Sequence, residues 1–443
     1  MEVISNEDLI SRKYWDIDIN QGPINVDENK AISTLQSLLI NSVRERMRSY
    51  SPIGVEISGG LDSSAILAIA SKLNNDFQVE INTFTHILDN ELKDEFFPFD
   101  DELTRCKIIL NHVGILNHYT ISATNESIIK SLESGLRKLH GPVTELFSIY
   151  SDKLYERVCQ EQTSILLSGF GGNEGVTYHA KDYIRELFYQ KDWNSIKRLL
   201  NNNLRPRFLL QLRTYLRLFV IVRLPFIEKF YWLLFRRNHF LLTRFRASPI
   251  KNPLRNKYNI KSKYYSEIFP TFNSSIGHNQ YRRINSNHIT SRIENSANIA
   301  QSYRIIYRYP FLDVKLLEYY FSLPSNFKYQ NNSSRYIFRK AIESFLPNDI
   351  VWNQNRVGAT IPSIYYRLDS ELEICRNIIK TSQKENRYHY IDYSKLTKMV
   401  DQLKDLAKGK KTNFGPKVFI NSIAILILQK WQREGKIDIG IKC

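Results

Sequence analysis

The 443-residue sequence predicts an α/β protein: a parallel sheet with helices on both faces, followed by a mostly helical C-terminal part that carries a basic helical insertion. Short apolar runs alternate with helical patterns up to about residue 180, where the strand signal stops and helical patterns dominate. Positive charge gathers in one later segment. We therefore expect a linker-like segment (1–27), an α/β core (28–180), a basic helical insertion (181–290) and a helical C-terminal part (291–443).

The order of elements in the core carries the α/β prediction. Residues 28–49 are predicted to form a helix because apolar residues recur at helical spacing, and a second helix follows a glycine turn near residue 60. The predicted strands are 52–58, 81–88, 115–122 and 164–168, and further helical patterns lie near 99–113, 125–139 and 150–161. Strands that alternate with helices indicate a parallel sheet, in which ligands bind at the carboxyl ends of the strands.

The cysteines and the N-terminus bear on the compartment. No C-x-x-C pair occurs, which argues against a disulfide framework and a zinc site and suits a reducing cytosol. The first ten residues are acidic where a secretion signal needs basic and apolar residues, so we expect a cytoplasmic protein. The four cysteines are Cys106, Cys159, Cys375 and Cys443.

The net charge of +17 is concentrated in residues 196–257, where 15 Lys or Arg stand against one acid, Glu228. The rest of the chain carries a net charge of 17 − 14 = +3. This segment is expected to dock an acidic peptide or partner protein, to lie on an anionic membrane surface, or to bind nucleic acid; the last is the least favoured, and a solvated cationic face is the fourth interpretation. Basic residues and Pro225 interrupt the apolar stretch 208–235, so no transmembrane segment is expected, and 418–428 is predicted to be a buried core helix.

The strongest motif lies between the first predicted strand and the second helix. Glycines allow the backbone to approach a phosphate, while hydroxyls and free N–H groups at a helix start donate to it. The aspartate offers a hard oxygen to Mg²⁺. The motif consists of Ser58, Gly59, Gly60, Leu61, Asp62, Ser63 and Ser64, and S-G-G-x-D-S in this context resembles the PP-loop family, which cleaves ATP between its α- and β-phosphates.

Five ordered elements then resemble the synthetase domain of the asparagine synthetases. The second glycine-rich signature, L-S-G-x-G-x-D-E, is similar to residues 167–174, and R-x-P-F-L-D is similar to 308–313. The remaining matches are 13–16 (the Y-W-D element), 101–102 (a D-E pair), and a C-terminal lysine/arginine region spread over 335–340, 346–347 and 352–362.

The resemblance implies a set of roles for individual residues. ATP is expected to contact the first motif together with Ser168, Gly169, Gly171 and Arg339, and Mg²⁺ to contact Asp62 and Asn173. The catalytic residues are expected to be Arg356, Glu174 and Lys340. Among the basic residues, Arg339, Lys340 and Arg356 would offset the charge on pyrophosphate and on the reacting phosphorus. Simpler interpretations also stand: Asp313 as a helix N-cap beside a core-packing turn, and a solvated basic helix face at 335–356.

Three departures from the family pattern limit that inference. The glutaminase nucleophile of asparagine synthetases is a cysteine at position 2, where this chain has Glu2, so we expect the amine to come from elsewhere. Asn173 stands where the family has a magnesium-binding aspartate, and an amide brings no charge. Arg356 stands where the family has its catalytic lysine, and arginine does not readily give up a proton.

The expected function is therefore an ATP-dependent, AMP-forming amide ligase that adenylates a carboxylate for attack by an amine. The glycine pair before Asn173 and the apolar helix ending at Trp431 look like the lasso-peptide cyclases, relatives without glutaminase activity, for which the substrate is a macrocyclised peptide. The alternatives are a nucleotide-binding pseudoenzyme or scaffold, a stand-alone ammonia-dependent asparagine synthetase, and a tRNA-modifying PP-loop enzyme.

Overall fold

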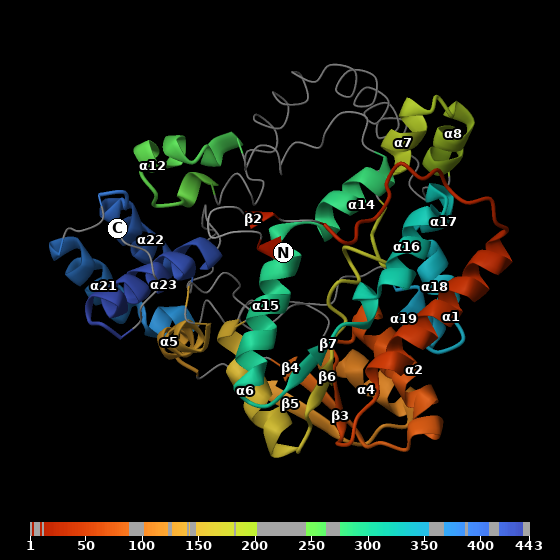
Figure 1. The fold of residues 1–443 in the computed structure, drawn as a ribbon, viewed down its shortest axis with the longest axis horizontal. Coiled ribbons are helices and arrows are strands. Elements are labelled where there is room, and N and C mark those ends of the chain that lie inside the picture. Colours follow the sequence, from red (N-terminus) through yellow and green to blue (C-terminus); the bar gives the residue numbers. More distant parts are fainter. Residues whose placement is uncertain are drawn as a thin grey trace.

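The centre of the protein is a five-stranded, fully parallel sheet in the order β5-β4-β3-β6-β7 (Figure 1). The computed structural model describes residues 2–3, 9–10, 13–87, 102–122, 126–139, 141, 148–180, 183–201, 245–262, 275–353, 367–385, 389–406 and 416–436. The strands are β3 (Ile53–Glu56), β4 (Ile81–Ile87), β5 (His118–Ser122), β6 (Ile165–Leu167) and β7 (Ile306–Arg308).

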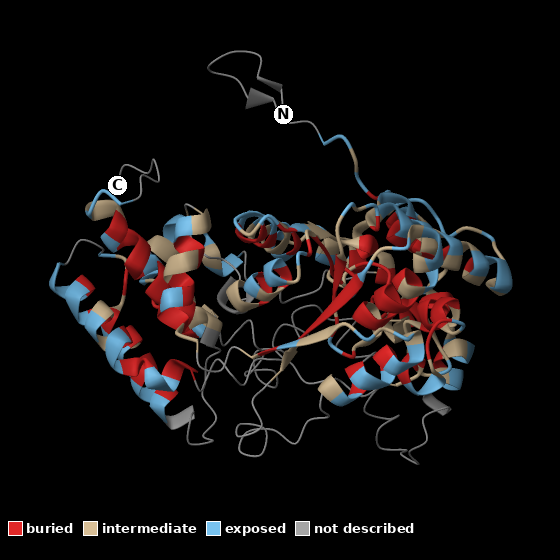
Figure 2. Ribbon diagram, turned by 90° about the horizontal axis from the view of Figure 1, so that it is seen from below, coloured by how far each residue is buried: buried red, intermediate tan, exposed pale blue. Residues whose placement is uncertain are grey.

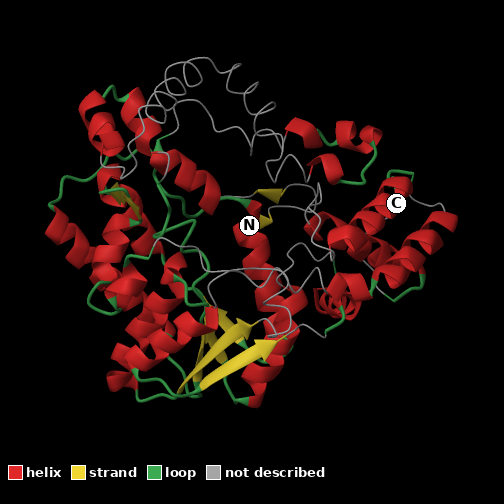
Figure 3. Ribbon diagram, turned by 180° about the vertical axis from the view of Figure 1, so that it is seen from behind, coloured by secondary structure: helices red, strands yellow, loops and turns green. Residues whose placement is uncertain are grey.

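Helices cover both faces of this sheet, as predicted (Figure 3). On one face lie α2 (Leu61–Phe77) and α4 (Glu102–Val113), and α1 (Glu28–Arg46) packs on α2. On the other lie α6 (Ser148–Gln160) and α15 (Asn287–Gln301). Every strand and helix predicted within the core is present, with ends that differ by a few residues.

The expectation that strands stop near residue 180 is wrong. β7 joins the sheet beside β6, more than a hundred residues later, and β8 (Tyr329–Gln330) pairs with β9 (Ser333–Ser334). β7 is only three residues long, and Ile306 is 58% exposed. A strand this short has no measurable alternation, so tertiary pairing alone reveals it.

The segment before α1 is tied to the C-terminal half. β1 (Glu2–Val3) pairs antiparallel with β2 (Leu9–Ile10). Trp15 Nε1 donates to Glu318 Oε1 over 2.8 Å, and Tyr281 Oη donates to Asp16 Oδ2 over 2.7 Å. Glu318 belongs to α16 (Val314–Ser322) and Tyr281 belongs to α14 (Ile276–Ile284). The Y-W-D element therefore anchors the N-terminal segment.

A second apolar cluster is formed by α5 (Ile128–Leu139), α21 (Leu372–Lys384), α22 (Tyr393–Leu406) and α23 (Pro416–Arg433). α23 contains the predicted core helix at 418–428, and its buried side faces the neighbouring helices (Figure 2). Glu371 accepts from the backbone N–H groups of Ile128 and Ile129, and so caps the start of α5.

The basic segment is described only at its ends, which include α8 (Trp193–Asn201) and α12 (Asn252–Lys257). Residues 202–244 lie outside the described residues, so the interpretations of the segment stay predictions. Within the part of the chain that the structure describes, no helix combines the length and apolar character needed to cross a membrane. Smaller helices complete the structure: α7 (Tyr183–Tyr189), η2 (Pro310–Leu312), α17 (Ser325–Lys328), α18 (Tyr336–Ile342) and α19 (Asn348–Val351).

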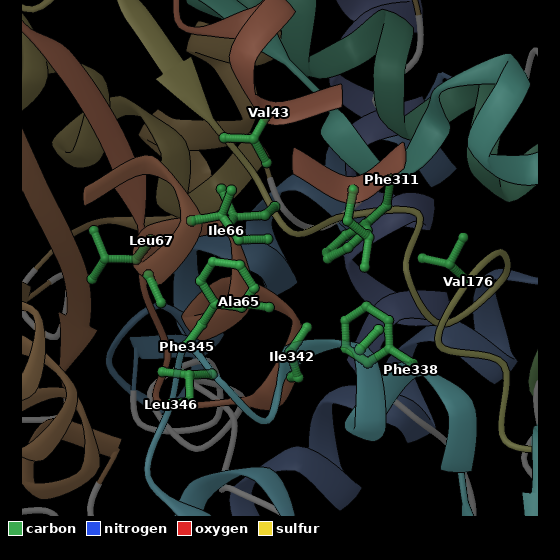
Figure 4. Packing of buried hydrophobic residues seen from close by; sticks show 14 of the residues in the cluster. Val43, Ala65, Ile66, Leu67, Val176, Phe311, Phe338, Ile342, Phe345 and Leu346 are labelled. Carbon is green, nitrogen blue, oxygen red and sulfur yellow. The ribbon is translucent and has the colours of Figure 1, made fainter. Parts of the chain in front are cut away.

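The main core lies between α1, α2, α16 and α18 (Figure 4). Phe311 of η2 is 1% exposed and meets Phe338 edge-on, with ring centroids 5.7 Å apart. Asp313 Oδ1 accepts from the backbone N–H of Leu316 and caps α16, while Oδ2 pairs with Arg46 over 3.1 Å. The interpretation of this element as a core-packing turn and N-cap is confirmed.

We expect Phe311→Ala to lower the free energy of unfolding by about 3–5 kcal/mol, because it leaves a cavity inside the main core. Urea denaturation measures this directly. Ile306→Ala, at an exposed position, is the control and is expected to change stability by less than about 1 kcal/mol. Equal losses for the two variants would contradict the central role of Phe311.

Candidate active site

The first turn, residues 58–64, connects β3 to α2 at the carboxyl edge of the sheet. Gly59 has φ +64°, and a Cβ there would lie 2.7 Å from Arg105 Cβ, so both backbone and space require glycine. Gly60 begins α2 without a side-chain cap, so N–H groups of the first helical turn point toward the edge of the sheet. Ser64 Oγ donates to the Gly60 carbonyl over 2.6 Å. The result is an open helix N-terminus, which suits a phosphate.

The second turn, residues 168–177, follows β6 and lies against the first. A Cβ on Gly169 would come 3.0 Å from the backbone N of Ser63, and one on Gly172 would come 2.9 Å from Asp62 Oδ2. Gly171 has φ +92° and lies over Leu312. The two predicted glycine motifs are thus in direct contact, and Gly169 and Gly172 of the second turn leave the space that this contact needs.

Asp62 lies where the two turns meet. Its Oδ2 accepts from Thr177 Oγ1 over 3.1 Å, whereas its Oδ1 is buried and has no hydrogen-bond partner among the described residues. Burial raises the pKa of this carboxyl, and the positive charge of Arg335 opposes the shift. An unpartnered buried carboxylate oxygen beside an open helix N-terminus fits Mg²⁺ bound to phosphate, which typically uses one or two protein carboxylates. The described residues contain no group of three or more acidic, His or Cys side chains that would hold a metal alone.

Arg335 was not among the predicted site residues, although the motif that begins with it was noted. Its Nη2 donates to Asn173 Oδ1 and, over 3.1 Å, to His179 Nε2. Its backbone is left-handed, with φ +63°, at the start of α18. Asn173, predicted to bind Mg²⁺, therefore has a guanidinium partner here, and its role as a metal ligand stays a prediction. Glu174 forms no hydrogen bond or ion pair with the described residues, but its charge acts on Asp62.

The basic side chains predicted to act in the site, Arg339 and Lys340, have partners in the segment after α18. Arg339 is 4% exposed and donates to three backbone carbonyls, those of Ser334, Val351 and Asn353. Burial and the charge of Arg335 lower its pKa to about 10, while Asp62 opposes that shift. Lys340 pairs with Glu343 over 3.0 Å and lies over the Trp352 ring. These contacts hold the segment after α18, and the charge of Arg339 also acts on Asp62 of the first turn. Arg356 and Asp101 lie outside the described residues.

A polar row, unpredicted by the sequence, lies on the α15 side of the same edge. The strand registers align Glu56 with Phe84, and continuing them by one residue places Ser168 beside Glu56 and Tyr309 beside Ser168. Tyr307 Oη donates to Glu56 Oε1 over 2.8 Å.

Arg292 of α15 covers this row. Its guanidinium carbon lies 4.9 Å from the ring centre of Phe170, which also meets Tyr309 and His288 edge-on. A charged residue within an apolar strand was the available signal for Glu56. No local pattern links it to Arg292.

The fold and the two touching glycine turns define an α/β domain of the PP-loop class. The asparagine synthase family model matches residues 34–433, and the chain belongs to that family. It is 23% identical over 428 residues to asparagine synthetase [glutamine-hydrolyzing] 1 of Bacillus subtilis, covering 94% of this chain and 62% of that protein.

Two other relatives match a smaller share of this chain. The putative asparagine synthetase [glutamine-hydrolyzing] 2 of Methanocaldococcus jannaschii is 27% identical over 185 residues, covering 39% of this chain and 32% of that protein. Asparagine synthetase [glutamine-hydrolyzing] 3 of B. subtilis is 20% identical over 363 residues, covering 79% and 51%. The chain therefore spans less than two thirds of the length of these relatives.

We expect Gly172→Ala to weaken binding of a non-hydrolysable ATP analogue by at least about tenfold, because the new methyl group displaces Asp62. Isothermal titration calorimetry measures the affinity. Gly277→Ala is the matched control, since its Cβ meets only Ser275 Oγ at 3.6 Å. Unchanged affinity in Gly172→Ala would contradict the contact between the turns.

We expect Asp62→Asn to raise the free energy of unfolding of the ligand-free protein at pH 7. The folded-state pKa of Asp62 is raised by burial, so its ionised form destabilises the fold, fully so above that pKa. The advantage of Asn should shrink as pH falls and vanish below about 3.9, the ordinary pKa of aspartate. Denaturation at several pH values tests this, with the exposed Asp76→Asn as control. A pH-independent difference would argue against it.

Proposed function

We propose that this chain is an ATP-dependent, AMP-forming amide ligase that activates a carboxylate as its adenylate for attack by an amine. The observation that carries the proposal is Asp62, whose buried Oδ1 lacks a partner at the contact of the two glycine turns. Family membership supports the same class of reaction.

The chain's own residues have separable tasks in this proposal. The open N-terminus of α2 binds phosphate oxygens through backbone N–H groups. Asp62, oriented by Thr177, would hold Mg²⁺, which when bound offsets the charge of the departing pyrophosphate. Arg335 adds positive charge beside Asp62 and is oriented by Asn173 and His179. Because Asn173 is neutral, its contact leaves the charge of Arg335 uncompensated there.

The same contact favours a second candidate, a nucleotide-binding protein without catalysis. Asn173 Oδ1 is engaged by a guanidinium, which competes with a metal for that oxygen. In this candidate ATP binds at the two turns and no carboxylate is activated.

The acid is proposed to be an amino-acid or peptide carboxylate, and macrocyclisation of a peptide is the form that the C-terminal helix suggested. The charge of residues 196–257 supports an acidic peptide as the substrate or partner.

We expect ATP–pyrophosphate exchange to depend on one carboxylate from a panel of Asp, Glu and short acidic peptides. Asp62→Ala should lower this exchange by at least about 100-fold, because the charge compensation at the turns is lost. Asp76→Ala, on the exposed far end of the same helix, should retain it. ATP binding without exchange for any acid would favour the non-catalytic candidate, and recovery of exchange in Asn173→Asp would then identify Asn173 as the cause.

A further inference from the structure

Glu56 is an ionisable group that the proposed adenylation does not use. It ends β3, whose other three residues are buried, and it is half-buried at the carboxyl edge. A carboxylate in such a place costs free energy, and it is retained only where something offsets that cost. Its hydrogen bond from Tyr307 Oη, 2.8 Å long, occupies one oxygen, Oε1.

The groups around Glu56 come from every neighbouring element. Ser168 lies beside it on the second turn, Tyr307 comes from β7, Tyr309 follows that strand, and Arg292 comes from α15. The charge of Arg292 also acts on His86 of β4. Burial raises the pKa of Glu56, and the hydrogen bond from Ser168, the charge of Arg292 and the hydrogen bond from Tyr307 oppose that shift. Burial together with Arg292 lowers the pKa of His86 to about 4, so His86 is neutral near pH 7. Glu56 is thus the basic group of this cluster, poised to accept a proton.

The position of Glu56 relative to the two turns is fixed by the sheet. Ser168 is its neighbour across β3 and β6, and the next residue, Gly169, touches the backbone of Ser63. Glu56 therefore borders the second turn through Ser168. Phe170, Tyr309 and Arg292 continue the same surface.

We propose that Glu56 forms the subsite for the amine substrate, a primary aliphatic amine that arrives as its ammonium ion and gives a proton to the Glu56 carboxylate. This rests on the proposed ligase function and names the residue that receives the nucleophile. The positive charge of Arg292 lowers the pKa of a bound ammonium ion and so favours the neutral amine, and Glu56 is the carboxylate that receives the released proton.

The ammonium ion gives one proton to Glu56, and the freed nitrogen lone pair attacks the carbonyl carbon of the adenylate. The new C–N bond forms as the C–O bond to the phosphate breaks, and AMP leaves with that bonding pair. The second nitrogen proton passes to water, and Glu56 returns its proton to solvent at the open edge.

The first test is equilibrium binding of n-butylammonium chloride to the full chain in the presence of a non-hydrolysable ATP analogue. Wild type should bind it, and Glu56→Gln should bind at least about tenfold more weakly, because the charged acceptor is gone. Glu28→Gln is the matched control, since Glu28 also accepts from a tyrosine, Tyr336, over 2.9 Å but lies at the start of α1. Equal n-butylammonium affinity in wild type and Glu56→Gln would overturn the proposal.

The second test separates the two half-reactions. Glu56→Gln should keep ATP–pyrophosphate exchange within about twofold and lose amide formation with n-butylamine by about 10²–10⁴-fold. Trapping of the adenylate by hydroxylamine, which is neutral near pH 7, should persist. A variant that weakens ATP binding and leaves the amine step intact would assign Glu56 to the nucleotide and overturn the inference.

The third test is the pH dependence of amide formation, which a purely structural role of Glu56 would not shift. In wild type, amide formation should fall as pH drops through the raised pKa of Glu56, and Tyr307→Phe should shift this limb to higher pH, since the tyrosine hydrogen bond lowers that pKa. An unshifted limb would overturn the proton transfer. If wild type shows no exchange with any acid, the ligase proposal fails, whereas n-butylammonium binding still decides whether Glu56 receives an ammonium ion.

Discussion

The contact between the two glycine-rich turns is the constraint on which the rest of the site depends. Gly169 lies against the backbone of Ser63, and Gly172 lies against the carboxylate of Asp62. A Cβ on Gly169 would press on the backbone of Ser63, and one on Gly172 would displace the side chain of Asp62. η2 supports the contact from the other side, because Leu312 packs under Gly171. The core around Phe311 therefore fixes the shape of the site as well as the stability of the fold.

Buried charges divide into two kinds in this protein. Arg339 and Lys328 donate to backbone carbonyls, and burial lowers the pKa of Lys328 to about 8, so their cations hold chain segments together. Asp62 instead accepts a hydrogen bond from Thr177, and Glu56 accepts from Tyr307 and from Ser168. Burial raises the pKa of both carboxyls. Where burial raises the pKa of a carboxyl in this way, a cation that binds beside the carboxylate is stabilised.

The sequence predicted the site unevenly. The first motif and the second turn were found because each lies within a few adjacent residues, and the structure brings them together. Arg339 and Lys340 carry the expected charge, but their contacts run to backbone carbonyls and to Glu343. Charge is visible in a sequence, whereas the direction of a side chain on a short helix such as α18 depends on what packs around it.

The sequence by itself determined the strand–helix alternation, the glycine-rich turns and the family, since periodicity and local backbone demands are written into neighbouring residues. Tertiary structure decided the partners. Tyr307 and Glu56 are 251 positions apart, Arg335 and Asn173 are 162, and Thr177 and Asp62 are 115. β7 exists because β6 offers an edge to pair with. Such contacts depend on the packing of the whole sheet, and no local pattern encodes them.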